Sequence, residues 1–190
     1  MRRDEAVYAL LKTFPMEASA GDSVLEQTPG RVAKMWGELL SGYNDDPQAI
    51  LNKRFKVMGG DSDGDGNGIV CISGIRFYSC CEHHLVPFYG TANIAYLPGE
   101  FVTGLSKFAR LVECYARRLQ VQERLTQQLI TAIEQYLKPR GAMVVVEAEH
   151  MCMAMRGVQK PGTKTVTSRV SGAFVSDKEL REEARRLLGL

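Results

Sequence analysis

The segment AMVVVEAEHMCMAM at residues 142–155 has a long strand pattern with a dense valine core. We expect one continuous strand over these residues. On a strand, residues two apart share a face, so His150, Cys152 and Arg156 would point the same way. That face would place an acid–base group, a metal ligand and a positive charge in a row, which predicts a metal site beside an anion site. The opposite face would carry a methionine stripe, interpreted as core packing: Met151, Met153 and Met155.

Strand and helix patterns alternate on either side of this segment. Runs rich in β-branched and aromatic residues predict further strands at 69–78, 89–97 and 164–174. Apolar residues at helical spacing predict helices at 4–14, 28–42, 105–118, 121–137 and 176–188. This order predicts an α+β fold in which N-terminal helices precede an antiparallel sheet with helices on one face. We expect a single domain over 1–190, with an N-terminal helical part at about 1–45 and the remainder at about 46–190.

Capping signals predict where two of the helices begin. Thr28 would be an N-cap and Pro29 the first helical residue, with Gly42 as a natural stop. Ser176 and Glu179 have the spacing of a capping box, which predicts the start of the last helix.

The composition limits the class of partner and the compartment. A net charge of +2 over 190 residues gives no electrostatic case for a nucleic-acid partner. No apolar run reaches about 18 residues, so we expect no membrane span, and the polar N-terminus argues against a secretory signal. Five cysteines are an odd number and too few for a disulfide scaffold, which favours reduced thiols in a cytoplasmic protein.

The histidines and most of the cysteines are concentrated in two short segments. These segments are CCEHH at 80–84 and HMC at 150–152. Cys80 with His83 and Cys81 with His84 are both Cys-x-x-His pairs, so spacing alone leaves the register open. Either pair with Cys152 supplies three ligands of the kind that a catalytic zinc uses, leaving a fourth position for water. The alternative is that the cysteines are buried as small hydrophobes and the histidines are hydrogen-bonded core residues.

An Asp/Gly-rich segment at 59–68 partly matches a calcium-binding loop. Asp61, Asp63 and Asp65 with Gly66 fit its first half, but the twelfth position is Ile72 instead of a bidentate glutamate. We therefore interpret the segment as a solvated hairpin connection.

Several motifs together closely resemble the GTP cyclohydrolase I family. They are TPGRVAKMW at 28–36, CEHHLVPFYG at 81–90, GLSKFARLVE at 104–113, RRLQVQERLTQQ at 117–128, EAEHMCMAMRGVQK at 147–160 and TVTSRVSGAF at 165–174. The resemblance covers about residues 28–175, and the motifs occur in the family's order. Residues 1–27 lack the family's usual acidic and arginine-containing stretch.

The resemblance implies a role for each residue of these motifs. It implies Zn²⁺ ligands at Cys81, His84 and Cys152, and acid–base residues at His83 and His150. It also implies substrate-binding residues. These are Ser106, Lys107, Arg110 and Arg156 for the triphosphate, Arg31 and Lys34 for further phosphate contacts from a neighbouring subunit, and Gln122 and Glu123 for the guanine ring.

The activity implied by the resemblance is zinc-dependent hydrolysis of GTP to 7,8-dihydroneopterin triphosphate and formate, the first step toward pterins and tetrahydrofolate. The implied fold is the tunnelling fold, in which subunit sheets join into an oligomeric barrel. The usual assembly is a homodecamer of two pentameric rings, with active sites at subunit interfaces.

Two other functions stay open at this point. One is a different enzyme of the same fold, such as a pterin synthase or a nitrile reductase, which would need another set of residues. The other is a non-catalytic, zinc-stabilised binding protein, which would need a closed site with four ligands.

Overall fold

The fold is known from a computed structural model that describes residues 1–15, 18–57 and 68–190, without the side chains of 18–22. The Asp/Gly-rich segment lies outside the described residues except at its last position. In chain order the elements are α1 (Arg3–Leu11), α2 (Ala18–Leu39), η1 (Ser41–Asn44), α3 (Pro47–Leu51), β1 (Arg54–Lys56), β2 (Val70–Cys81), β3 (Pro87–Leu97), β4 (Phe101–Thr103), α4 (Ser106–Ala116), β5 (Leu119–Gln120), α5 (Gln122–Ala132), η2 (Ile133–Leu137), β6 (Gly141–His150), α6 (Met151–Ala154), β7 (Lys164–Gly172), α7 (Ala173–Ser176) and α8 (Lys178–Leu188).

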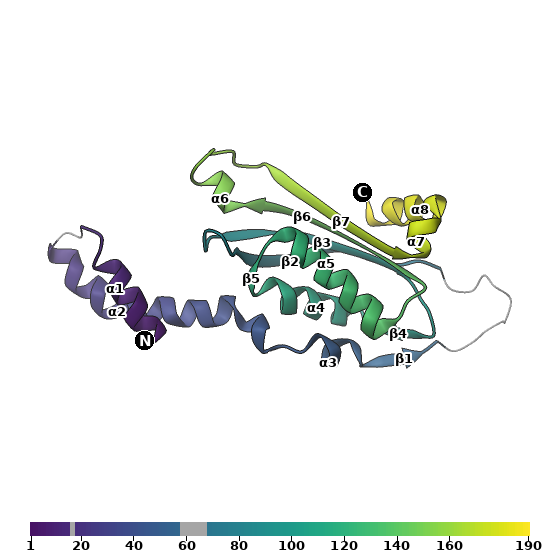
Figure 1. The fold of residues 1–190 in the computed structure, drawn as a ribbon, viewed down its shortest axis with the longest axis horizontal. Helices are drawn as coiled ribbons and strands as arrows, with labels where there is room; N and C mark the ends of the chain where they lie inside the picture. The colour runs from purple at the N-terminus through teal and green to yellow at the C-terminus, as the bar shows by residue number, and fades with distance from the viewer. Residues whose placement is uncertain (16–17, 58–67) are drawn as a thin grey trace.

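A five-stranded sheet forms the centre of the molecule (Figure 1). Its strand order is β5-β2-β3-β6-β7, and every pair is antiparallel except the short parallel pair β2–β5. β1 and β4 form a separate two-stranded sheet. The expected α+β fold with an antiparallel sheet is therefore confirmed.

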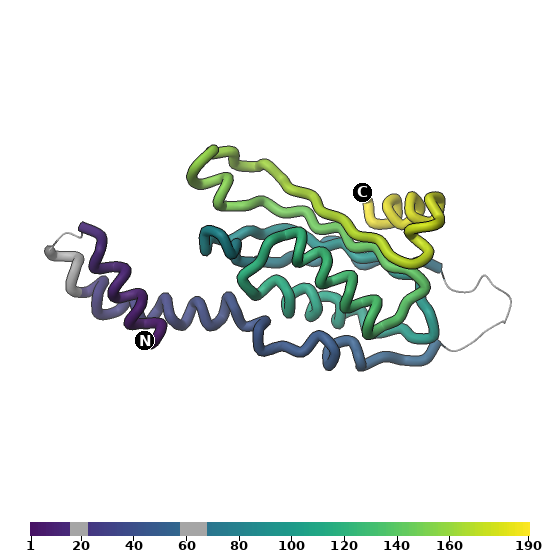
Figure 2. Tube along the Cα trace, viewed as in Figure 1, coloured from purple at the N-terminus to yellow at the C-terminus, as the bar shows by residue number. Residues whose placement is uncertain are grey.

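Helices pack on both faces of the sheet. On one face, Ile94 of β3 and Val144 of β6 pack in a core with Leu129 of α5, all fully buried. Alternate residues point the other way, so Ala95 and Val145 join a second cluster that α7 and α8 complete. The expectation of helices on one face holds for α4 and α5 but is wrong for α8, which covers the opposite face (Figure 2).

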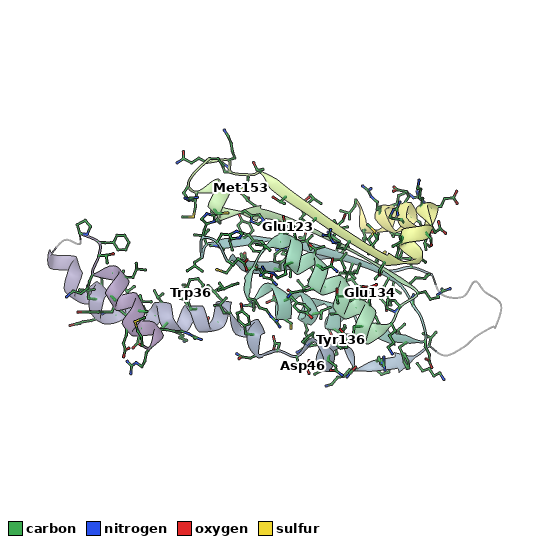
Figure 3. The ribbon with its side chains drawn as sticks, viewed as in Figure 1. Trp36, Asp46, Glu123, Glu134, Tyr136 and Met153 are labelled. Carbon is green, nitrogen blue, oxygen red and sulfur yellow. The ribbon has the colours of Figure 1, made fainter. Side chains whose placement is uncertain are left out.

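α1 and α2 form a helical hairpin that projects from the sheet (Figure 1). α2 begins at Ala18 and contains Pro29, so the predicted helix start at Pro29 is wrong. Trp36 is only half-buried and Met35 is 43% exposed, which leaves an apolar stripe of α2 without full cover in this chain (Figure 3). None of the described helices, including this long one, has the length and apolar character needed to cross a membrane.

The strand expected over 142–155 stops early. β6 ends at His150, and Met151–Ala154 form the short helix α6. The reason is that β6 has no strand to pair with beyond this point. Its pairing with β3 stops at Phe88, which lies opposite His150, and its pairing with β7 stops at Lys164, which lies opposite Glu149. The predicted alternation of faces beyond residue 150 is therefore wrong, and so is the methionine stripe, since Met155 is 59% exposed.

The last helix begins one residue later than the predicted capping box. Asp177 is the N-cap of α8, and its carboxylate accepts a hydrogen bond from the Leu180 backbone N–H at 3.0 Å. Ser176 instead ends α7, where its hydroxyl donates to the Ala173 carbonyl at 3.3 Å.

We predict that Asp177→Ala lowers the free energy of unfolding by about 1 kcal/mol, because the first turn of α8 loses its capping acceptor. Ser176→Ala is the matched control and should have a clearly smaller effect. Urea denaturation followed by circular dichroism measures both variants. A larger loss for Ser176→Ala would contradict the assignment of the cap.

Candidate metal centre and acid–base site

A tight turn after β2 folds a histidine back toward a cysteine. The Cys81 carbonyl accepts hydrogen bonds from the backbone N–H groups of Leu85 at 2.8 Å and His84 at 3.4 Å, and the Cys81 N–H donates to the Val86 carbonyl at 2.9 Å. Leu85 completes the turn with a left-handed φ of 56°. The turn places His84 Nδ1 3.7 Å from Cys81 Sγ.

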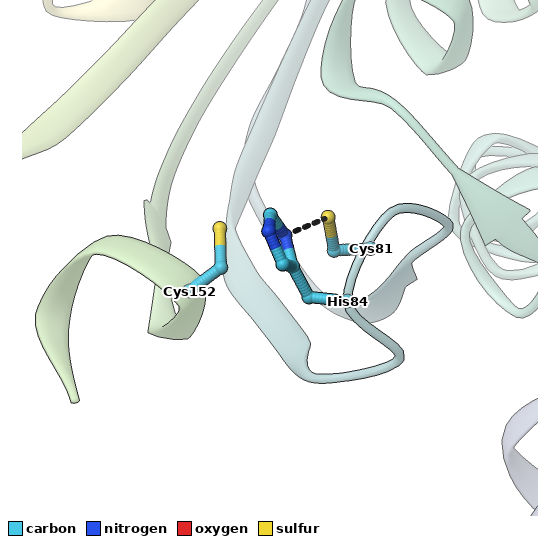
Figure 4. Close-up of side chains that lie close together, drawn as sticks. All are labelled: Cys81, His84 and Cys152. Atoms are coloured by element: carbon cyan, nitrogen blue, oxygen red, sulfur yellow. Dashed lines mark hydrogen bonds between the residues drawn. The ribbon is translucent and has the colours of Figure 1, made fainter. Parts of the chain in front are cut away.

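A second cysteine approaches this pair from the helix that follows β6. Cys152 lies in α6, directly after β6, and its side chain faces those of Cys81 and His84 (Figure 4). Within the described part of the chain, the ligand atoms of these three residues all lie within 4.8 Å of one another. The group could hold a metal ion.

The donor set fits zinc in chemistry and spacing. Zinc bonds of about 2.3 Å to sulfur and about 2.0–2.1 Å to nitrogen, at tetrahedral angles, separate S from N by about 3.6 Å and two sulfurs by about 3.8 Å. The Cys81 Sγ to His84 Nδ1 distance of 3.7 Å is close to the first value. Two soft thiolates with one imidazole are typical zinc ligands.

The structure also separates the two Cys-x-x-His registers that spacing left open. Cys80 is buried to 4% exposure, and its Sγ lies 3.9 Å from the Cys81 carbonyl instead of joining the group. The His83 side chain is 63% exposed, with Nε2 3.9 Å from the Glu82 carboxylate. The residues brought together are therefore Cys81, His84 and Cys152.

Burial and neighbouring groups shift the pKa of the Cys152 thiol. Burial and the neighbouring Cys81 thiol raise the pKa of Cys152, whereas Arg156 lowers it. A bound cation favours thiolates, so metal binding would release protons from the two cysteines. Arg156 follows α6 and does not lie on a strand, so the row of His150, Cys152 and Arg156 along one strand face is not formed; a phosphate contact by Arg156 stays a prediction.

An ion pair that sequence analysis missed joins α5 to the turn at residues 81–86, which carries two of the candidate metal ligands and is called the metal-binding turn below. Arg124 of α5 donates to both oxygens of the Glu82 carboxylate, at 2.5 and 2.9 Å. The hydrogen bond from Arg124 lowers the pKa of Glu82. Because Glu82 directly follows Cys81, this bidentate pair ties the turn to α5. The two residues are 42 positions apart, and no spacing pattern in the sequence connects them.

His150 is held at the end of β6 beside the metal centre. Its ring stacks on Phe88, with centroids 4.6 Å apart and an interplanar angle of 2°. Its Nε2 lies 2.8 Å from Gln122 Oε1. Burial lowers the pKa of His150, and the charge of Glu123 partly opposes this shift.

The two residues expected at the guanine ring differ in exposure. Gln122 is 1% exposed, and its side-chain amide contacts β6, β7 and His150. Glu123 is exposed at the start of α5, toward the same end of the sheet as Met153 of α6 (Figure 3). Glu123 is therefore open to solvent, whereas Gln122 is enclosed by the protein.

The remaining residues expected at phosphate lie elsewhere in the chain. Ser106, Lys107 and Arg110 lie in the first turns of α4. Arg31 and Lys34 are exposed on the projecting helix α2, where Arg31 donates to Gln27 at 2.7 Å. The four cationic side chains and the one hydroxyl of this set therefore lie on α2 and α4, whereas Cys81, His84 and Cys152 lie at the end of β2, in the turn after it and in α6.

The length of α4 indicates how far Ser106 lies from the candidate metal ligands. The helix has 11 residues and so is about 16 Å long. Its C-terminal end leads to β5, which pairs with Cys80 and Cys81, while Ser106 begins the opposite end. Ser106 and Arg110 line a separate cavity of about 530 Å³ with Ser41 and Asp45, and no ligand of the metal centre lines it.

Comparisons with known proteins agree with one another. A family model described as GTP cyclohydrolase I matches residues 4–189, so the match extends well beyond the 28–175 expected from the motifs and includes most of the N-terminal segment. A GTP cyclohydrolase 1 of Streptococcus thermophilus (strain CNRZ 1066) is 50% identical over 186 residues, 97% of this chain and 95% of that protein. A GTP cyclohydrolase 1 of Finegoldia magna is 50% identical over 166 residues, covering 87% and 86% of the two chains. One of Mycobacterium ulcerans is 49% identical over 189 residues, covering 98% and 89%.

We predict that Cys81→Ala abolishes tight metal binding, because only two of the three candidate ligands remain to hold the ion. Cys80→Ala is the matched control: it removes the adjacent thiol and should leave the metal content unchanged. Metal analysis of the purified proteins by mass spectrometry gives the answer. Loss of metal from Cys80→Ala together with retention in Cys81→Ala would place the site in the other register.

Proposed function

The chain belongs to the GTP cyclohydrolase I family, and from this membership we propose that it is a zinc-dependent enzyme that hydrolyses GTP to formate and 7,8-dihydroneopterin triphosphate. The observation that carries the proposal is the Cys81–His84–Cys152 group at the same sheet end as His150. With its five free cysteines, the protein would act in a reducing compartment, which we take to be the cytoplasm.

The three-ligand group supports a catalytic role for the metal. A zinc ion with three protein ligands leaves one position for water and lowers the pKa of that water to about 7. A purely structural zinc site has a fourth protein ligand, and the group found among the described residues has three members. The non-catalytic alternative therefore has no support in this arrangement.

His150 and His83 are suited to the proton transfers of this reaction. Release of C8 of guanine as formate breaks its bonds to N7 and to N9, and each departing nitrogen needs a proton. An imidazole can carry a proton and give it up again near neutral pH, so a histidine can protonate a departing nitrogen and then be recharged. His150 is held in place by Phe88 and Gln122. His83 is exposed on the metal-binding turn, where it can meet a bound substrate.

Glu123 is the residue that would select guanine. Its carboxylate can accept hydrogen bonds from the paired N1–H and exocyclic amine of guanine. Adenine does not offer this pair of donors, so a bound adenine would leave the carboxylate without partners. Glu123 is exposed toward the end of the sheet that holds the metal centre, which supports this assignment.

The open edges of the sheet support assembly into a barrel. On the described residues, β2 pairs with β5 only at Cys80 and Cys81, and β7 pairs with β6 alone. The strand order makes β2 and β7 run in opposite directions, so β7 of one copy can pair antiparallel with β2 of the next. Repeating this head-to-tail contact closes a ring, which removes both edges. We propose the family's decamer of two such rings.

Assembly would also complete the substrate site. A neighbouring copy could supply Ser106, Lys107 and Arg110 to the triphosphate next to Arg156. Contact with the projecting helix of a further copy would add Arg31 and Lys34 and would cover the exposed apolar stripe at Met35. Arginine suits the bidentate recognition of phosphate oxygens.

We predict that the purified protein releases formate from GTP and forms a pterin that fluoresces after oxidation. Cys152→Ala should lose both metal and activity, because a ligand is missing. His150→Ala should keep its metal and lose about 10²–10⁴-fold in kcat, the usual contribution of a positioned acid–base group. A metal-loaded wild-type protein that releases no formate would overturn the proposed function.

Sites shared between subunits predict complementation of two inactive variants. Cys152→Ala and Arg110→Ala should each be inactive alone, yet co-expressed subunits should regain about a quarter of the wild-type activity by random mixing in the ring. The measurement is the specific activity of the purified mixed oligomer. If mixed oligomers are no more active than either variant, metal and Arg110 do not serve one site from different subunits.

A further inference from the structure

Gln122 lies between His150 and two strands, and its side-chain amide has a defined orientation. Its Nε2 lies 3.0 Å from the Val146 carbonyl and 2.9 Å from the Thr165 carbonyl. Backbone carbonyls only accept hydrogen bonds, so the group that faces them must be the NH₂ and not the amide oxygen. The usual ambiguity between the two ends of a glutamine amide is therefore removed by its partners.

This orientation determines which nitrogen of His150 carries a proton. Gln122 Oε1 faces His150 Nε2 at 2.8 Å, and an amide oxygen can only accept. His150 Nε2 must then donate, so the neutral ring is the Nε2–H tautomer. In this tautomer Nδ1 keeps its lone pair and is the ring atom that can exchange a proton with a ligand.

The surroundings prevent the amide and the ring from reorienting. Gln122 is 1% exposed, and Thr126, which is fully buried, donates to the Gln122 backbone carbonyl at 2.9 Å and contacts Thr167 Oγ1 at 2.6 Å. The His150 ring lies flat on Phe88, which is also fully buried. Turning the amide over would leave two buried carbonyls facing an oxygen, which costs far more than the hydrogen bond to His150 contributes.

We infer that Gln122 is a positioning residue that fixes the orientation of the His150 ring and holds it as the Nε2–H tautomer, which leaves Nδ1 as the ring atom open to a ligand. This inference rests on the proposed function, and it assigns Gln122 a different role from the guanine contact that the family resemblance implies. A guanine contact would require amide atoms that are already engaged by Val146, Thr165 and His150. Glu123 alone would then recognise the base through its side chain.

The kinetic test compares two buried glutamines. Gln122→Met removes the acceptor of His150 and the donor to β6 and β7. Gln120→Met is the matched control, because Gln120 is also 1% exposed and its amide donates to the Tyr115 carbonyl at 2.8 Å and to Gln128 at 2.7 Å, away from His150. We expect kcat of the assembled, metal-loaded Gln122→Met enzyme to fall about 10- to 100-fold, part of what a general acid–base group contributes. The dissociation constant for GTP and the metal content should stay within about twofold of wild type.

Two kinetic results would overturn the inference. One is weaker GTP binding by Gln122→Met with unchanged kcat, as expected for a guanine contact. The other is an equal fall of kcat in Gln120→Met, which would show that loss of any buried amide here acts through the fold.

A spectroscopic test needs no variant that could fail to fold. The chain has three histidines, so solid-state ¹⁵N NMR of the sedimented, metal-loaded protein labelled at histidine gives few imidazole signals, and His83→Ala helps to assign them. Above about pH 8, where an ordinary imidazole is neutral, His150 should show a protonated Nε2 and an unprotonated Nδ1. The reverse pattern, or a mixture of both, would overturn the inference. Because this signal does not depend on turnover, it separates failure of the inference from failure of the proposed function.

Discussion

The pairing of β3 with β6 is the constraint on which the site depends. Its last pair joins Phe88 to His150, and the chain leaves the sheet at both strands just beyond it. Close approach of the two strands requires Gly90, because a Cβ there would lie 1.9 Å from the Glu147 carbonyl oxygen. A shift of one residue in this register would turn His150 to the other face of the sheet and move Cys152 with it. The register therefore sets the position of His150 relative to the three residues that could hold a metal ion.

The helix α5 contacts both the hydrophobic core and the residues of the candidate metal centre. α5 buries Leu125 and Leu129 in the core while its first turn provides Gln122, Glu123 and Arg124. One helix thus contacts His150 through Gln122 and the metal-binding turn through Arg124. Rigid placement of this kind is what an acid–base residue and a metal ligand need, since small displacements weaken proton transfer.

Much of the sheet could be predicted from local pattern alone. The strand pattern at 89–97 corresponds to β3, and the helical periodicity at 121–137 corresponds to α5 followed by η2. Such patterns record which residues are buried, and burial follows the fold closely. The end of β6 could not be predicted in this way, because it depends on where its neighbours end and not on the residues 151–155 themselves.

The candidate site was predictable in its residue types more than in its geometry. Clustered cysteines and histidines indicated a metal centre, but only the turn after β2 separates Cys81 and His84 from the competing pair. The contact between Gln122 and His150 joins residues 28 positions apart, and a glutamine carries no pattern that predicts such a partner. Residues proposed to act from a neighbouring copy, such as Arg31 and Arg110, would be harder still to identify, because a single chain would hold only part of such a site.

The central claim is that Cys81, His84 and Cys152 hold zinc with one position left to water. X-ray absorption at the zinc edge of the purified, substrate-free protein tests this claim most directly. The account predicts two sulfur neighbours at about 2.3 Å, with one nitrogen and one oxygen at about 2.0–2.1 Å. A shell of three or four sulfurs, or one with a single sulfur, would contradict it.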